Sequence, residues 1–417
     1  MPLDANEQRL CAHIGARSGE LLADLAAHVA IPTGTGHRAG IDEYRAAIVE
    51  RLVALGGRVE LVPGDARPEW LRLPHAPRAA VAGSGAAPDE APPTAIVTRR
   101  AGQRHPSILI AGHLDTVHDP HGDFRLLSIA PDGATATGPG AADMKGGILV
   151  AVAALESLAA NGIDLPWTFL LNADEETGSF HSAGALRAAA AKHRIGLALE
   201  PALPDGSLVV ERMGTGQFRV EVLGRAAHVG RDFANGVSAV FALAKLMVHM
   251  EEMIDLPRGA IVNVGPIAGG LVTNAVPDHA ACWGNVRFAD ESVQRELEAK
   301  FAALATVGER APGGAEILPR VVVDTAFNRP AKLLTPEVRR LAEAAQRVGA
   351  DLGQRISFGK TGGVCDGNIL QAAGLPTIDT LGVRGGNLHR TDEFVEVASL
   401  VERCRLFAVL MARLMAG

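Results

Sequence analysis

The hydrophobic and polar positions of the chain begin with two helical patterns and a strand. Apolar residues at helical spacing predict an opening helix over residues 6–29 and a second helix at about 41–55. A strand is predicted at 58–62. Residues 64–93 are rich in Pro, Ala and Gly and show little periodicity, which is typical of a surface excursion rather than a domain.

Strands and helices then alternate along the chain. Short apolar runs predict strands at 107–111, where Gly112 would end the strand, and at 167–172 and 195–199. Helices are predicted between them at 146–160 and 181–192. This alternation predicts an α/β fold with a mixed, mostly parallel sheet and helices on both faces. In such sheets, functional sites collect beyond the carboxyl ends of the strands.

The pattern changes at about residue 213. The order strand–helix–strand–strand–helix–strand is predicted, which is the split ferredoxin-like arrangement. These elements are expected at 217–223, 236–253, 260–265, 279–288, 292–306 and 317–323. After residue 328 the first pattern resumes, with elements at 335–348, 366–373, 376–380 and 396–415. We therefore predict a first domain built from residues 1–212 and 328–417, with residues 213–327 inserted as a ferredoxin-like α+β domain.

Length and composition narrow the class of protein. A chain of 417 residues is long for one compact core, which favours two domains. Forty basic and 47 acidic side chains give a formal net charge of −7 without a basic run, so nucleic acid is not an expected partner. The four cysteines lie far apart, which argues against a zinc knuckle and a disulfide framework. We find no signal peptide and no span long enough for a bilayer, so we predict a cytoplasmic protein that binds no membrane.

Acidic and histidine side chains follow the predicted strands of the first domain. His113 and Asp115 lie two residues apart, so an extended chain points them the same way. Beyond the next strands come Asp174, Glu175, Glu176 and Glu200, while Asp143 precedes a helix and His389 follows the glycine-rich turn Gly382–Gly386. A single acidic loop is usually solvated surface, but this many such residues at strand ends favours a metal site.

Five of these side chains form a candidate ligand set, namely His113, Asp143, Glu176, Glu200 and His389. Two imidazoles and three carboxylates suit a hard or borderline divalent metal. If one carboxylate is shared, each of two metals has two further protein ligands and an open position. Two-metal hydrolases hold their ions about 3.5–4 Å apart, so that a bridging water becomes hydroxide near neutral pH. In the Glu175–Glu176 doublet, one carboxylate can be a ligand and its neighbour the base.

Three segments resemble the signature segments of the co-catalytic zinc metallopeptidases. They are Gly112-His113-Leu114-Asp115-Thr116-Val117, the run from Gly138 to Gly147, and Asp174-Glu175-Glu176-Thr177-Gly178-Ser179. That family includes aminoacylases, acetylornithine deacetylase, succinyl-diaminopimelate desuccinylase and bacterial glutamate carboxypeptidases. The resemblance covers nearly the whole chain, with the three motifs in the family's order.

The resemblance implies two Zn²⁺ ions per chain, with Co²⁺ or Mn²⁺ as possible substitutes. Asp143 would bridge the ions, with His113 and Glu200 on one and Glu176 and His389 on the other.

Two further residues receive roles from the same resemblance. Glu175 would be the general base, and Asp115 would orient His113. The Asp143–Met144 peptide bond is expected to be cis.

Among the members of the family, the chain is most similar to the glutamate carboxypeptidases. The shared features are Ile31–Gly36, the run ending at Phe180, and Glu200-Pro201. We therefore predict a hydrolase that releases a C-terminal amino acid. An N-acyl-amino-acid deacylase is the alternative, and a non-catalytic family member is a third possibility. The chain departs from the pattern at Met144, where an acidic residue is expected, and in a longer stretch over 64–103. The specificity loop, in which Gly362 and Gly363 are expected to contact substrate, also differs.

The insert carries three more candidates. Gly224-Arg225-Ala226-Ala227-His228 resembles the segment that takes a histidine into the neighbouring subunit's site. Asn274 and Arg287 match residues that hold the substrate carboxylate and the developing oxyanion. His228 could instead be an ordinary turn histidine, and Arg287 an ordinary exposed arginine. We predict a homodimer formed through residues 213–327, with His228 completing the partner's site.

Overall fold

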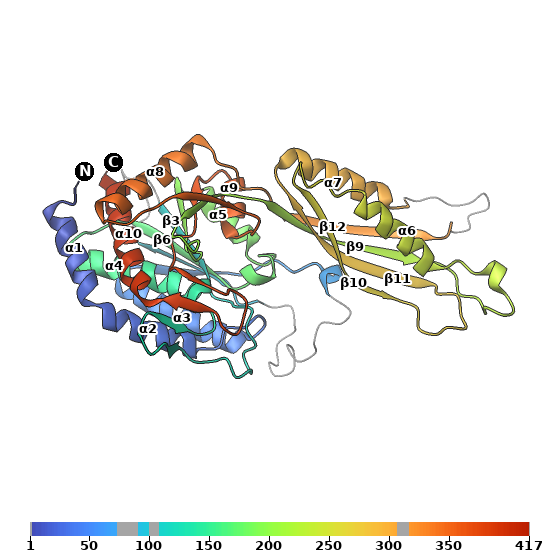
Figure 1. The fold of residues 1–417 in the computed structure, drawn as a ribbon, viewed down its shortest axis with the longest axis horizontal. Coiled ribbons are helices and arrows are strands. Elements are labelled where there is room, and N and C mark those ends of the chain that lie inside the picture. The colour runs from blue at the N-terminus through green and yellow to red at the C-terminus, as the bar shows by residue number, and fades with distance from the viewer. Residues whose placement is uncertain (1, 73–90, 100–107, 307–316, 417) are drawn as a thin grey trace.

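The structure consists of two parts that lie end to end, each organised around its own sheet (Figure 1). It is a computed structural model, and it describes residues 2–72, 91–99, 108–306 and 317–416. Most of the predicted excursion at 64–93 therefore lies outside the described residues.

A six-stranded sheet forms the centre of the first part. Its strand order is β1-β2-β6-β3-β7-β14, and β2 alone runs against the other five strands. The strands are β1 (Arg58–Val62), β2 (Thr94–Arg99), β3 (Ile108–His113), β6 (Trp167–Asn172), β7 (Ile195–Ala198) and β14 (Thr377–Ile378). This confirms the predicted mixed, mostly parallel sheet.

Helices cover both faces of this sheet. Ile108 and Ile110 of β3 pack in a core under α1–α4, α8 and α10, whereas Leu109 and Ala111 pack with α5 and α9. This alternation follows from the two-residue period of a strand, which turns successive side chains to opposite faces. The helices are α1 (Ala5–Ala16), α2 (Ser18–Ala30), α3 (Arg38–Ala54), α4 (Gly147–Ala160), α5 (Ala183–Ala190), α8 (Pro336–Asp351), α9 (Asp366–Ala372) and α10 (Val397–Ala416).

The prediction of one opening helix over 6–29 is wrong, because the helix breaks at Arg17. This residue has non-helical backbone angles (φ −88°, ψ 8°), and its guanidinium lies 2.8 Å from the carboxylate of Glu156 on α4. The break leaves two short helices, α1 and α2, which both contact α4 and α10.

The predicted end of β3 at Gly112 is also wrong. The ladder with β6 continues through Gly112 and His113, which makes His113 the last residue of the strand. A Cβ atom at this position would lie 3.1 Å from both Ile148 and Met144, closer than most real Cβ contacts, so a larger residue would require these side chains to shift. Tight packing against α4, rather than a turn, therefore explains this glycine.

Further short elements complete the first part. The sequence pattern did not indicate β2 or β8 (Leu208–Arg212), which pairs in parallel with β13 (Phe358–Thr361). A second small sheet contains β4 (Ser128–Ile129), β5 (Thr135–Thr137), β15 (Gly385–Gly386) and β16 (Phe394–Glu396). A kinked turn, η3 (Ala141–Gly146), leads into α4, and Asp143 and Met144 within it have non-helical backbone angles. All four cysteines are buried and unpaired.

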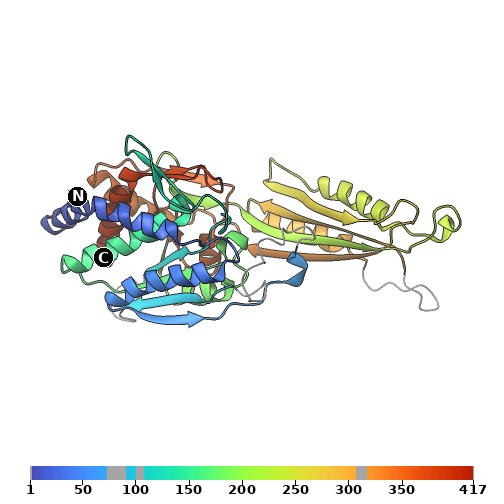
Figure 2. The ribbon, with the colours of Figure 1, turned by 90° about the horizontal axis from the view of Figure 1, so that it is seen from below.

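The second part extends away from the six-stranded sheet as an elongated arm (Figure 2). Its antiparallel sheet has the order β10-β11-β9-β12, and α6 and α7 pack on that sheet. The succession of strands and helices is the predicted one, although β12 extends beyond the predicted end at 323. The elements are β9 (Gly214–Leu223), α6 (Ala239–Glu251), β10 (Ala260–Gly269), β11 (His279–Phe288), α7 (Glu291–Leu304) and β12 (Arg320–Arg329).

Within the described residues, every helix is too short or too polar to cross a membrane. The cytoplasmic location and the domain limits at 213 and 327 stay predictions.

Candidate metal centre

The carboxyl ends of β3, β6 and β7 bring most of the predicted ligands to one edge of the first sheet. His113 ends β3, Glu176 follows β6 by four residues, and Glu200 follows β7 by two. A cavity of about 410 Å³ opens at this edge, and Asp143, Glu176, Glu200 and His389 are among its lining residues. These side chains therefore lie close together, as predicted from the strand ends, while their role as metal ligands stays a prediction.

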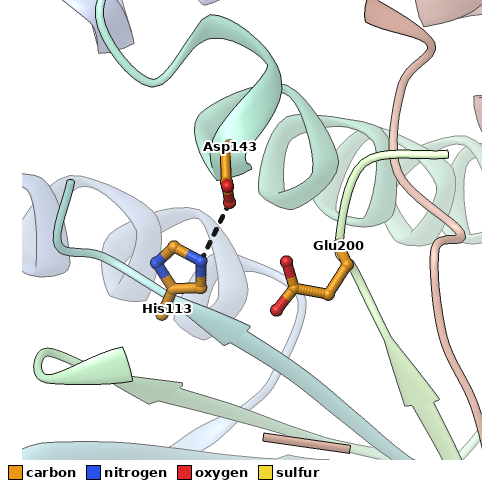
Figure 3. Close-up of side chains that lie close together, drawn as sticks. All are labelled: His113, Asp143 and Glu200. Atoms are coloured by element: carbon orange, nitrogen blue, oxygen red, sulfur yellow. Dashed lines mark hydrogen bonds and ion pairs between the residues drawn. The ribbon is translucent and has the colours of Figure 1, made fainter. Parts of the chain in front are cut away.

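His113, Asp143 and Glu200 form a first group of possible metal ligands. One ligand atom from each lies within 4.8 Å of the others, and all three residues are buried. His113 Nε2 is 3.1 Å from Asp143 Oδ1, and the three side chains point toward one another (Figure 3). This geometry leaves a space that a single divalent ion could occupy.

Asp143 also belongs to a second group, with Glu176 and His389. Their ligand atoms again lie within 4.8 Å of one another. His389 Nε2 is 3.3 Å from Glu176 Oε2 and 3.6 Å from Asp143 Oδ2. The His389 side chain is 54% exposed, so this side of the site is open to solvent. One carboxylate is thus common to two ligand groups, as a bridged pair of ions requires.

Burial and neighbouring charged groups shift the pKa values of the candidate ligands. Burial, together with the nearby carboxylate of Asp143, raises the pKa of Glu200 well above its ordinary value. Burial likewise raises the pKa of Glu176. Hydrogen bonds to Asp143 and Glu176 raise the pKa of His389 to about 10. Burial is the main cause for the two glutamates and the neighbouring carboxylates add to it, so a divalent cation would stabilise their charged forms.

An unpaired buried oxygen and the types of donor atom also fit a metal. Glu176 Oε1 is buried and has no hydrogen-bond partner among the residues that the structure describes. Leaving a buried carboxylate oxygen unpaired is costly unless it binds a ligand. Two imidazoles and three carboxylates also match the donors that zinc, cobalt and manganese accept in proteins.

Asp115 contacts the segments that carry the candidate ligands and is completely buried. Its two carboxylate oxygens accept the backbone N–H groups of Glu175 (3.2 Å) and Glu176 (3.0 Å). His113 Nδ1 is 2.9 Å from the backbone oxygen of Asp115 and 3.6 Å from its carboxylate. Donation by Nδ1 to that carbonyl leaves Nε2 free to bind a metal.

Glu175 lies beside the ligands but in neither ligand group. Its carboxylate lines the cavity, and Oε1 is 2.9 Å from Nη2 of Arg329. Burial raises the pKa of Glu175 to about 8, although the charge of Arg329 opposes that rise. A buried carboxylate of this kind, next to a possible metal, can accept and hold a proton.

Arg329 belongs to a buried network that the sequence did not indicate. It also donates to Ser179 Oγ (2.6 Å), which lies 2.5 Å from Asp366 Oδ1, and Asn172 donates to Asp366 Oδ2 (2.7 Å). Arg329 is the last residue of β12, so the strand that returns from the insert places this cation beside Glu175. No local motif marks this arginine, because its role depends on where β12 ends in space.

The peptide bond between Asp143 and Met144 is cis, as the resemblance implied. The side chain of Met144, which replaces an expected acidic residue, is buried, and its sulfur lies 3.1 Å from the backbone nitrogen of His113.

The three candidate residues of the insert differ in burial. His228 and Asn274 are exposed, and neither is among the described residues that line the cavity. They lie on two paired segments, and the loop of residues 224–238 is at the end of the arm away from the first part (Figure 1). Arg287 is half-buried, and burial and the charge of Arg329 lower its pKa.

The predicted specificity loop meets the cavity at Gly363, whereas Gly362 is not among the lining residues. The backbone oxygen of Gly363 accepts a hydrogen bond from Arg212 Nη1 (3.1 Å). Arg212 also binds both carboxylate oxygens of Asp379, at 3.1 and 2.9 Å. The sequence indicated neither Arg212 nor Asp379, which come from separate segments of the first part.

Comparisons with known proteins identify the family of this chain. A family model described as Peptidase family M20/M25/M40 matches residues 109–413. The chain is 29% identical over 337 residues to carboxypeptidase G2 of Pseudomonas sp. (strain RS-16), a match that covers 77% of each chain. It is 31% identical over 339 residues to succinyl-diaminopimelate desuccinylase of Methylobacterium radiotolerans, with 74% of this chain and 81% of the relative covered.

A solved structure shares the fold. The YXEP protein of Bacillus subtilis, a dinuclear metal binding peptidase from the M20 family, is similar with a TM-score of 0.65 and 14% identity. The match covers 96% of this chain and 99% of that one.

Proposed function

This chain belongs to Peptidase family M20/M25/M40 and is a metallohydrolase that acts on peptide or amide bonds, and from this premise we propose that it is a two-zinc carboxypeptidase. The observation that carries the proposal is the position of Asp143. Its carboxylate is common to two ligand groups, and Glu175 lines the same cavity. The similarity to carboxypeptidase G2 supports release of a C-terminal amino acid.

Five residues would hold the metals in this proposal: His113 and Glu200 on one ion, Glu176 and His389 on the other, and Asp143 on both. When bound, the ions polarise the scissile carbonyl and make water more acidic. Zinc is proposed because it accepts this mixed set of nitrogen and oxygen ligands.

Glu175 is proposed as the general base. Its carboxylate accepts the proton of the attacking water and then donates that proton to the leaving nitrogen. The ion pair with Arg329 fixes one end of the carboxylate. Asp115 holds the Glu175–Glu176 turn through two backbone N–H groups, so base and ligand keep different directions.

Substrate contacts are assigned to the insert and the specificity loop. Arg287 Nη1 is buried without a hydrogen-bond partner in the described part of the chain, which suits a donor waiting for a substrate carboxylate. We assign the developing oxyanion to Asn274 and His228. Gly362 and Gly363 would contact the substrate through their backbone.

We further propose that residues 213–327 form the dimer interface. β10 is an edge strand, which can pair with its copy about a two-fold axis. Large apolar side chains are exposed on α6 and in and after β10, namely Phe241, Val248, Ile267, Leu271 and Val272. In such a dimer, the exposed His228 would reach the partner's site.

A substrate panel on zinc-reconstituted protein tests the function. We expect hydrolysis of dipeptides with a free C-terminal amino acid, loss of activity with a chelator and recovery with zinc. Preferential cleavage of N-succinyl or N-acetyl amino acids would show a deacylase instead. Protein that holds two metals per chain but hydrolyses none of these amides would contradict the proposal.

A further inference from the structure

Glu393 is a buried carboxylate in a segment that is otherwise exposed. Thr391 and Asp392 before it are exposed, whereas Glu393 is 1% exposed. It lies four residues after His389 and immediately before β16. Acidic side chains are rarely buried this completely unless they are paired, so its partners indicate its purpose.

The carboxylate of Glu393 is bound almost entirely by the turn that carries Asp143. Oε1 accepts the backbone N–H groups of Ala142 (2.9 Å) and Asp143 (3.0 Å), and Oε2 accepts that of Gly140 (3.3 Å). Oε2 also lies 2.6 Å from Nε2 of His118. Hydrogen bonds to an ionised carboxylate are stronger than those between neutral groups, and here they act on η3 and the glycine before it.

These contacts join three separate segments of the ligand set. His118 lies five residues after His113, on the chain that leaves β3. The three backbone donors belong to the turn of Asp143, and Glu393 itself ends the loop of His389. One side chain therefore connects the segments that supply His113, Asp143 and His389.

We propose that Glu393 is a positioning residue that assembles the metal site before any metal binds. This inference rests on the proposed metal ligands. Like-charged carboxylates repel one another, so a fixed backbone at Asp143 helps to keep its carboxylate close to Glu176 and Glu200. The bond from its N–H to Glu393 keeps the carboxylate between the two ligand groups. Residues that orient metal ligands in this way commonly set metal affinity.

Metal affinity of the metal-free protein is the test. Zinc binding to wild type, Glu393→Gln and Glu396→Gln is measured by competition with a chromophoric chelator. We expect Glu393→Gln to bind about 10–100-fold more weakly, in the range found for residues that support metal ligands. Glu396→Gln is a matched control, because Glu396 lies on β16 but pairs with Arg384 at 2.8 Å outside the site. The zinc affinity of Glu396→Gln should equal that of the wild type.

A spectroscopic readout separates positioning from simple support of the fold. The visible absorption of the Co²⁺-loaded protein reports ligand geometry, and we expect a changed spectrum for Glu393→Gln. Glu393→Asp keeps the charge on a shorter side chain and should recover part of the affinity. His118→Gln leaves the three backbone hydrogen bonds to Glu393 in place, so it should lose less zinc affinity than Glu393→Gln. These two variants carry the test if Glu393→Gln does not fold.

A lowered melting temperature with native zinc affinity and a native Co²⁺ spectrum would overturn the inference. Wild-type protein that binds no metal would instead contradict the proposed function, so the two failures are distinguishable.

Discussion

Predicted site residues lie in two regions, the carboxyl edge of the six-stranded sheet and the outer end of the insert. The two regions differ in how deeply these residues are buried and in whether other predicted site residues lie next to them. Three of the five candidate ligands, His113, Asp143 and Glu200, are buried, and all five lie in one of the two ligand groups. His228 and Asn274 are exposed and lie away from the cavity. All five candidate ligands therefore lie together within one chain, whereas His228 and Asn274 would reach such a site only in a second chain or after a movement of the arm.

The largest expected effect concerns the ligand edge. Asp143→Ala should abolish binding of both metals, because the lost carboxylate belongs to both ligand groups. Elemental analysis of the purified variant checks this, with Asp132→Ala in an exposed loop as the control. Two metals per chain in Asp143→Ala would show that another group bridges.

Glu175→Ala should separate binding from catalysis. We expect it to retain its metals but to lose turnover by about 10²–10⁴-fold, the usual contribution of a general base. Metal content and kcat are measured on the same preparation. Loss of metal from this variant would exchange the roles of Glu175 and Glu176.

Subunit mixing tests whether the insert acts on the partner. His228→Ala should lower kcat by about 10²–10³-fold, as for loss of an oxyanion donor. Mixing it with Glu175→Ala under exchange conditions should restore activity toward half per mixed dimer, since one site then has both side chains. His279→Ala, at an exposed histidine of β11 in the same part of the molecule, is the control. No recovery despite verified exchange would remove His228 from the partner's site.

A smaller effect compares packing in the two regions. Gly112→Ala in β3 should lower the free energy of unfolding by about 1–3 kcal/mol, because the new methyl group meets Ile148 and Met144 at 3.1 Å. Gly265→Ala in β10 should be tolerated, since its nearest neighbour, the Trp283 backbone oxygen, is 3.6 Å away. Denaturant unfolding of both variants measures the two free energies of unfolding. Equal decreases would contradict this difference in packing.

The sequence predicted that the candidate ligands lie close together, because the signal for this clustering is local. Strand periodicity placed β1 and β6 with correct bounds, and parallel strands bring their carboxyl ends to one edge. β2 was missed because its apolar run follows a long stretch rich in Pro and Ala. The break at Arg17 was missed because it depends on a contact with Glu156 on a distant helix.

The supporting residues could not be predicted from one sequence. Arg329 and Glu393 look like ordinary surface charges until the chain is folded. Arg329 contacts Glu175 because β12 returns from the insert at that point, and Glu393 contacts the turn of Asp143 because the end of the His389 loop lies against it. Such long-range pairings leave no periodic signal.

The most direct test of the central claim is a crystal structure of the zinc-loaded protein with anomalous scattering at the zinc edge. We predict two peaks per chain, about 3.5–4 Å apart, with the Asp143 carboxylate between them. His113 and Glu200 should bind one ion, and Glu176 and His389 the other. A single peak, or ions held by other residues, would contradict the account.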